Sequence, residues 1–156
     1  MKATDMELGW LAGIVDGEGH IGLYRATPTK TSKAIRPILQ IVNTDIRIIE
    51  ACRRIIVDII GKPINVSVLE KKTHQKDVYR LAVGSQKDLL ILLPTISRFL
   101  VGKREQADNV VSFCAGRGKR QIRPFAEDES LYSRCRELNR RGVKEHTALN
   151  APATVQ

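Results

Sequence analysis

Two carboxylates separated by glycine end an apolar stretch near the start of the chain, in the run Asp16-Gly17-Glu18-Gly19. The apolar residues before them recur at helical spacing, so both acids are expected at the C-terminal end of a helix. Glycine is common just after a helix, where it supplies a positive φ. Acids are disfavoured there, because the helix end carries partial negative charge. A divalent cation that takes carboxylate and carbonyl oxygens would offset this charge, so we interpret the helix end as a metal site.

The start of this helix and one of its faces can also be predicted. Thr4 and Glu7 have the T-x-x-E spacing of a capping box. Gly9 and Gly13 lie four residues apart, on one helical face. Small residues at this spacing let a second helix backbone approach closely. The sequence therefore predicts one short helix with a close-packing face and a metal-binding end.

The segment Leu11 to Gly19, LAGIVDGEG, resembles the signature motif of the LAGLIDADG homing endonucleases. The order of the following elements agrees with that family over about residues 5–115. The resemblance implies an α+β fold of αββαββα order, with a mixed or antiparallel four-stranded saddle-shaped sheet and C-terminal helices. It also implies a site-specific endonuclease that serves intron homing.

Composition points independently to a polyanionic partner. The chain has 156 residues, enough for one domain with a hydrophobic core. Lys and Arg number 26 against 17 Asp and Glu, a net charge of +9. Such a surplus favours nucleic acid as the partner, although a merely basic protein would show the same count. Aromatic residues make up 4%, which disfavours stacking of unpaired bases and leaves contacts with a duplex open.

The cysteines and the hydropathy pattern bear on the compartment. Cys52, Cys114 and Cys135 are odd in number and lack C-x-x-C spacing, so a zinc ribbon or a disulfide framework is not expected. The start of the chain shows no secretion signal, and no apolar run reaches the roughly 18 residues of a membrane span. We expect a protein of an intracellular, reducing compartment, the cytoplasm or an organelle of the intron host, without a membrane partner.

The pattern of apolar residues predicts the remaining elements. Strands are expected at 20–25, 35–43, 64–70 and 78–83, and helices at 45–60, 86–100, 103–115 and 126–141. Pro37 places the second strand near an edge or a bulge, and Pro94 predicts a kink or restart in its helix. Residues 1–141 are expected to form a single domain that includes a basic linker at 116–125, followed by a tail at 142–156.

Polar residues alternate with apolar ones along the strands, which gives the sheet one dry face and one hydrogen-bonding face. Such a face suits the DNA major groove, although an ordinary solvated face has the same pattern. We expect base or phosphate contacts from the outer face, the two hairpin loops and the C-terminal segment. The candidate DNA-binding residues are Tyr24, Lys30, Lys33, Arg36, Ile38, Gln40, Asn65, Ser67, Lys71, Arg80, Arg140, Arg141 and Lys144.

The resemblance assigns the catalytic positions. Glu18 matches the metal-binding carboxylate of the motif, and Gly17 would add its carbonyl oxygen. The expected cation is Mg²⁺, for which Mn²⁺ or Ca²⁺ can substitute in binding. Asn43 matches the polar residue that ends the second strand near the attacking water, and Lys103 the basic residue near the scissile phosphate. Arg47, one helical turn beyond Asn43, is expected to join this network.

The motif occurs once in the chain, so cutting both strands would require a homodimer. Gly9, Ala12, Gly13 and Asp16 are the expected dimer interface, and a structural hydrogen bond at the helix end is the alternative for Asp16. A twofold dimer matches a long pseudo-palindromic double-stranded DNA site, cut in a Mg²⁺-dependent reaction that leaves 3′ overhangs. An RNA-binding intron maturase and a non-cleaving DNA-binding regulator of the same fold are the alternative functions.

Overall fold

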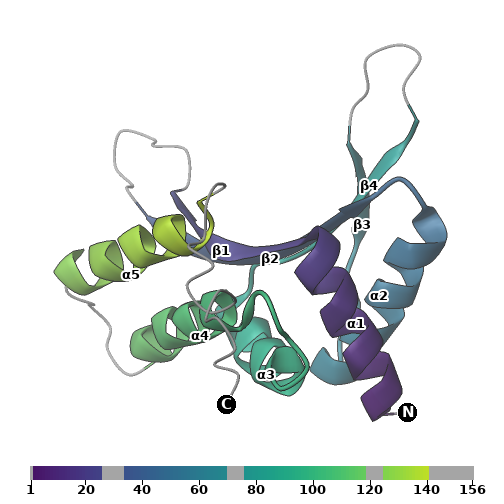
Figure 1. Cartoon of the computed structure of the whole chain (residues 1–156), viewed down its shortest axis with the longest axis horizontal. Coiled ribbons are helices and arrows are strands. Elements are labelled where there is room, and N and C mark those ends of the chain that lie inside the picture. The colour runs from purple at the N-terminus through teal and green to yellow at the C-terminus, as the bar shows by residue number, and fades with distance from the viewer. Residues whose placement is uncertain (1, 26–33, 70–75, 119–124, 141–156) are drawn as a thin grey trace, which may run out of the picture.

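A computed structural model describes residues 2–25, 34–69, 76–118 and 125–140, which hold five helices and four strands (Figure 1). Helix α1 is followed by a first hairpin, helix α2, a second hairpin and three further helices. The bounds are α1 Asp5–Glu18, β1 Gly19–Arg25, β2 Ile35–Asn43, α2 Ile46–Ile60, β3 Val66–Leu69, β4 Val78–Val83, α3 Gln86–Ser97, α4 Arg104–Gly118 and α5 Phe125–Leu138. The α+β class and the αββαββα order followed by further helix are confirmed.

The four strands form one antiparallel sheet in the order β1-β2-β4-β3. In the register of the sheet Leu39 of β2 lies opposite Ile21 of β1 on one side and Val83 of β4 on the other. Pro37 pairs with Leu23 of β1, at a point of β2 that β4 no longer reaches. The nitrogen of proline has no hydrogen to donate. Proline is tolerated at this point because β4 does not pair there and needs no donor.

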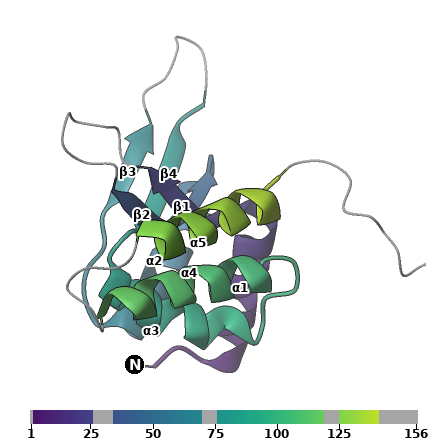
Figure 2. The ribbon, with the colours of Figure 1, turned by 90° about the vertical axis from the view of Figure 1, so that its left-hand side faces the viewer.

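One face of the sheet is covered by helices, and the other is open. Figures 1 and 2 show α1 to α4 together on one side of the curved sheet, with α5 beside β1. The covered side carries the core, in which Leu11, Ile21, Leu39, Ile41 and Leu81 are fully buried. Because side chains alternate along a strand, the residues between these core positions lie on the open face. The C-terminal end of α1 meets the sheet, and the N-terminus of the chain lies at the far end of this helix (Figure 1).

Local signals determine where α2 begins and ends. The carboxylate of Asp45 accepts the backbone N–H of Arg47, as an N-cap does. Gly61 follows the helix in the left-handed conformation, with φ 73°, and its N–H donates to the carbonyl of Val57. Glycine adopts this conformation without the steric cost that a Cβ would add.

Several boundaries differ from those predicted. Helix α3 runs continuously through Pro94 and ends at Ser97, and β3 begins at Val66. Helix α4 continues to Gly118, so the predicted linker begins inside it, because the glycines of this segment do not stop the helix. Helix α5 ends at Leu138, three residues before the predicted end. The predicted tail lies outside the described residues.

Helix α5 covers the outer edge of β1. The backbone N–H of Leu23 donates to Sγ of Cys135 at 3.0 Å, and the side-chain amide of Asn139 donates to the carbonyl of Ile21 at 3.0 Å. A Cβ on Gly22 would lie 3.2 Å from both Cys135 Sγ and Asn139 Nδ2, so this glycine permits the close approach. Cys135 of the helix and Asn139 just after its end thus satisfy backbone groups that another strand would otherwise pair.

None of the helices in the described ranges combines the length and apolar character that a membrane span requires.

Candidate functional site

Glu18, the last residue of α1, is an exposed carboxylate that Asn43 binds. The side-chain amide of Asn43 donates a hydrogen bond to its Oε2. The Oδ1 atom of Asn43 accepts the backbone N–H of Asp45 at 2.7 Å, which turns the Nδ2 of Asn43 toward Glu18. The start of α2 therefore orients Asn43, and Asn43 orients the carboxylate.

Gly19 follows Glu18 in an extended conformation, with φ −79° and ψ 161°, and not with the positive φ expected from the sequence. A Cβ at this position would lie 2.7 Å from the carbonyl oxygen of Val15 and 2.8 Å from its Cα. Real Cβ atoms do not approach so closely. Glycine is needed here for space as the chain turns from α1 into β1, and its N–H closes the last turn on the carbonyl of Val15.

Asp16 binds the segment that joins α3 to α4. Its Oδ2 accepts the backbone N–H of Val101 at 2.7 Å, and its Oδ1 accepts that of Lys103 at 2.9 Å. Gly102, between these residues, would place a Cβ 3.7 Å from Oδ1, so the segment wraps closely around the carboxylate. The hydrogen-bonding role considered for Asp16 is thus present within one chain.

Lys103 supplies positive charge to the same helix end. Its Nζ donates to the carbonyl oxygens of Val15 at 2.8 Å and of Asp16 at 2.5 Å. An ammonium at this place offsets the partial negative charge of the helix C-terminus. The positive group that the sequence required beside these acids is therefore present as a lysine side chain, before any cation is considered. Lys103 lies about 85 residues along the chain from α1, at sequence separations of 88 and 87 from its acceptors.

Arg47 points its guanidinium at Asp45, with hydrogen bonds of 2.6–3.2 Å to both carboxylate oxygens. These bonds and that from the backbone N–H of Arg47 lower the pKa of Asp45 to about 2. The side chain of Arg47 is 87% exposed. Arg47 therefore reaches the Glu18–Asn43 pair only through Asp45, whose backbone N–H binds Asn43.

The donor atoms fit a metal ion only if other groups complete its shell. Within the described ranges no three His, Cys, Asp or Glu side chains lie together as a metal cluster. Both oxygens of Asp16 already accept backbone N–H groups, so Glu18 is the carboxylate at this helix end with an exposed side chain. Mg²⁺ commonly binds one or two carboxylates together with water and substrate phosphate. Glu18 and the Gly17 carbonyl fit such a shared site.

His20 is a polar residue of this region that was not among the predicted site residues. Its Nε2 lies 2.9 Å from the position that a Cβ on Gly22 would take. Burial, and then the charge of Lys103, lower its pKa. The signal that could have found it is its spacing, two residues after Glu18 on the first strand.

The open face of the sheet carries most of the described candidate DNA contacts. Tyr24 and Arg36 are exposed and lie opposite each other in the β1–β2 register. Ile38 and Gln40 are half-buried on the same face of β2. Arg80 lies opposite Ser67, and its Nε donates to the Ser67 hydroxyl at 3.2 Å.

Two groups of candidate contacts lie off this face. Asn65 is exposed just before β3 begins, so it is not on the strand as predicted. Arg140 is exposed beyond the end of α5. The other candidates fall outside the described residues, and they are Lys30, Lys33, Lys71, Arg141 and Lys144.

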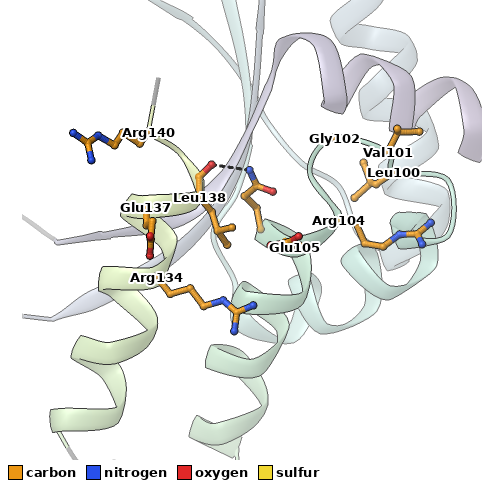
Figure 3. Close-up of a pocket in the computed structure, with 10 residues that line it drawn as sticks. Leu100, Val101, Gly102, Arg104, Glu105, Arg134, Glu137, Leu138 and Arg140 are labelled. Atoms are coloured by element: carbon orange, nitrogen blue, oxygen red, sulfur yellow. Dashed lines mark hydrogen bonds between the residues drawn. The ribbon is translucent and has the colours of Figure 1, made fainter. Parts of the chain in front are cut away.

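A cavity of about 1020 Å³ lies between the α3–α4 segment, the start of α4 and the end of α5 (Figure 3). Gln106 closes part of it by donating from Nε2 to the carbonyl of Leu138 at 3.1 Å. Its charged lining is mixed in sign. The charged side chains are Arg104, Glu105, Arg134, Glu137 and Arg140. This cavity borders Val101 and Gly102, but neither Glu18 nor Asn43 lines it.

The structure leaves part of the predicted dimer face of α1 open, at Gly13. Ala12 is fully buried in the core of its own chain, so its side chain is not available to a second chain. A Cβ on Gly9 would contact the ring of Phe99 at 3.8 Å, whereas Gly13 and Gly17 have open space. The same stripe carries Met6 and Trp10, which are 82% and 41% exposed. The glycine spacing predicted a close-packing face, but the core occupies part of it.

Solved structures share this fold. The archaeal intron-encoded homing endonuclease I-Vdi141I, complexed with DNA, has a TM-score of 0.69 and 15% identity, over 91% of this chain and 89% of its own. The homing endonuclease I-CvuI, in complex with a DNA target in the presence of Mg, has a TM-score of 0.64 and 21% identity, over 89% and 85%. The LAGLIDADG homing endonuclease I-LtrWI, bound to target DNA, has a TM-score of 0.62 and 17% identity, over 89% and 46%.

Comparison by sequence finds no match for this chain, whereas comparison by structure does. No protein-family model matches the chain, and no curated protein matches it. The match to I-Vdi141I and I-CvuI covers most of each chain. The chain therefore has the fold of the LAGLIDADG homing endonucleases, as its motif predicts.

Proposed function

We propose that this protein is a site-specific homing endonuclease that hydrolyses both strands of a long double-stranded DNA site and leaves 3′ overhangs. The observation that carries the proposal is the exposed carboxylate of Glu18, held by Asn43 at the point where α1 meets the sheet. An acid at the C-terminal end of a helix lowers stability, because it opposes the helix dipole. A protein that only binds DNA would have no need to keep such an acid. The shared fold with endonucleases bound to DNA supports the same conclusion.

Glu18 and the carbonyl of Gly17 would hold Mg²⁺ together with a DNA phosphate. The cation, when bound, would polarise the phosphate and lower the pKa of a bound water. Asn43 would keep the carboxylate in one orientation. Lys103, anchored on the helix end, would place its positive charge near the phosphate as negative charge develops in the transition state. Mn²⁺ or Ca²⁺ would substitute in binding.

The open sheet face would read the DNA bases. Arginine pairs with guanine and glutamine with adenine in the major groove, and each good pair contributes about 1–3 kcal/mol of discrimination. Arg36, Gln40 and Arg80 offer these groups on one face. The Nε of Arg80 donates to the hydroxyl of Ser67, which would help to orient the guanidinium on this face. The net charge of +9 would supply sequence-independent attraction to phosphate.

A homodimer would bring the two copies of Glu18 together. The stripe Met6, Trp10, Gly13 and Gly17 leaves α1 with an exposed face that lacks Cβ atoms near its metal-binding end. Val101, which is 91% exposed, lies beside this end through its bond to Asp16. Two copies of α1 packed along this stripe would supply a carboxylate for each strand of a pseudo-palindromic site. The chain covers less than half of I-LtrWI, so two copies approach the length of that protein.

The test is selection of cleaved duplexes from a randomised DNA library in Mg²⁺, followed by cleavage and binding assays on the selected duplex. We expect cutting of both strands that stops when EDTA removes Mg²⁺, and light scattering should give a dimer mass on DNA. Glu18→Gln should bind the duplex and fail to cut it. Duplex binding without cutting by the native chain would indicate a regulator, and normal cutting by Glu18→Gln would refute the role of this residue.

A further inference from the structure

Hydrogen bonds run in both directions between the end of α1 and the segment that joins α3 to α4. The Asp16 carboxylate, on α1, accepts the N–H groups of Val101 and Lys103. The Lys103 ammonium, on the other segment, donates to the carbonyls of Val15 and Asp16. We name these four hydrogen bonds the Asp16–Lys103 clamp.

We propose that Asp16 is a positioning residue for the reaction, and that the clamp determines where Glu18 and the Lys103 ammonium lie relative to each other. This inference rests on the proposed function, which gives Glu18 and Lys103 roles in the reaction and gives Asp16 none. Asp16 would act through other groups, since its own oxygens are taken by backbone N–H donors.

The geometry favours this role because the clamp holds the turn that ends in Glu18. The carbonyl of Val15 accepts both the Lys103 ammonium and the backbone N–H of Gly19, the residue that follows Glu18. Fixing Val15 and Gly19 leaves the backbone of Glu18 little freedom between them. Asn43 then fixes the carboxylate from the side of the sheet. The acid is thus held at its backbone by the clamp and at its head group by Asn43.

The clamp also determines the place of the ammonium. Lysine is a flexible four-carbon chain, so its charge is precise only if its backbone is held and its head group has fixed acceptors. The carboxylate of Asp16 holds the backbone of Lys103 by accepting its N–H. The backbone carbonyl oxygen of Asp16 is one of the acceptors of the Lys103 ammonium. A Cβ on Gly102 would lie 3.7 Å from Oδ1 of Asp16, an ordinary van der Waals contact, so the segment passes directly beside the carboxylate.

A metal ligand or an interface contact would look different. A metal-binding Asp16 would turn an oxygen toward Glu18, whereas each of its oxygens faces a backbone N–H 2.7–2.9 Å away. An interface residue would be exposed beside Gly13 and Gly17, whereas Asp16 is half-buried under Val101 and Gly102. The contacts of Asp16 are hydrogen bonds that join two elements of one chain.

The experiment compares Asp16→Asn with Asp108→Asn, a matched acid-to-amide change at an exposed position of α4. The first readout needs no activity and follows the Glu18 carboxyl ¹³C signal and the exchange of the Val101, Lys103 and Gly19 amide protons. We expect Asp16→Asn to shift the carboxyl signal and speed exchange at all three amides, with no change in Asp108→Asn. An unshifted Glu18 signal with Gly19 exchange unchanged would overturn the proposal, even if the native chain cuts no DNA.

The second readout uses the duplex selected with the native chain. We expect Asp16→Asn to lower the single-turnover cleavage rate by about tenfold or more, because small misplacements of reacting groups are costly. The dissociation constant for the duplex in Ca²⁺ should stay within about twofold of the native value, as the clamp makes no base contact. Asp16→Asn should add little to Lys103→Met in the double variant, since both act through one clamp. Full additivity, or an equal loss of cutting and binding, would overturn the positioning role.

Discussion

The two ends of α1 carry the same kinds of residue and use them in opposite ways. At the N-terminal end, the Glu7 carboxylate accepts the Thr4 backbone N–H at 2.8 Å and an ion pair from Arg54 at 2.8 Å. Acids at that end complement the helix dipole. At the C-terminal end, Asp16 and Glu18 oppose the dipole, and the fold compensates with the Lys103 ammonium and the backbone N–H groups of the α3–α4 segment.

This contrast separates acids that stabilise the fold from acids that the fold has to support. Glu7 and Thr4 form a capping box, which satisfies two donors of the first turn with no help from the rest of the chain. Asp16 needs partners about 85 residues away, at sequence separations of 85 and 87. Glu18 accepts a hydrogen bond from the side-chain amide of Asn43 and stays exposed. An exposed acid that opposes the helix dipole is a candidate catalytic group, whereas an acid that complements the dipole, such as Glu7, is expected to act on stability alone.

The largest effect is expected at Glu18. Glu18→Gln removes the charge and keeps the shape, so cleavage should fall by about 10³-fold, because charge stabilisation by a bound cation is worth several kcal/mol. The unfolding midpoint should rise or stay the same, since a charge that opposes the helix dipole is removed. Single-turnover cleavage checks the expected fall in rate, and thermal unfolding checks the expected midpoint. A clear fall in the midpoint would mean that Glu18 supports the fold, and the contrast between the two helix ends would fail.

A smaller effect on cleavage and a larger one on stability are expected for Lys103→Met. Methionine keeps the length of the side chain but leaves the carbonyls of Val15 and Asp16 without the ammonium donor. Losing a partly buried, charged hydrogen bond costs about 1–3 kcal/mol. Cutting should slow more than duplex binding weakens, as measured by single-turnover rates and by titration in Ca²⁺. Lys103→Arg serves as the control that keeps the charge. Equal losses in rate and binding would make Lys103 a plain phosphate contact.

The smallest effect is expected at Glu7, and it depends on pH. The Thr4 backbone hydrogen bond and then Arg54 lower the pKa of Glu7 from its ordinary 4.5 to about 2. A lowered pKa in the folded chain stabilises the fold above pH 4.5, and this contribution disappears as the pH falls toward 2. Glu7→Gln should lower the unfolding midpoint at pH 7 and make the midpoint less sensitive to pH in this range. Midpoints measured from pH 7 to pH 2 check this. An unchanged pH dependence would show that the capping box contributes nothing through charge.

The features that could be predicted from the sequence are those that depend on neighbouring residues. The capping box spans four residues, from Thr4 to Glu7. The alternation of polar and apolar residues along the strands predicted the correct faces for Arg36, Gln40 and Arg80. The predicted dimer face included Ala12, which is buried in the core of its own chain, because helical spacing gives several stripes and only tertiary packing decides which one is buried. The next stripe round the helix, with Trp10 and Gly17, is the open one.

The support of the site could not be predicted for the same reason. A motif placed Glu18 and its resemblance placed Asn43 and Lys103, but nothing local to Lys103 shows that its ammonium binds the carbonyl of Val15, 88 residues away. The bond between Asn43 and Glu18 joins residues 25 apart across the sheet. Sequence patterns locate such residues on their own elements, and only the fold determines which elements meet.

The cover of β1 by α5 has a consequence for how the chain forms. β1 is made early in synthesis, whereas Cys135 and Asn139, whose side chains satisfy its outer backbone groups, leave the ribosome more than 110 residues later. Until then the nascent first hairpin presents an uncovered strand edge to any other chain nearby. The protein is therefore most vulnerable to wrong strand pairing during translation, and its last described helix is what ends that interval.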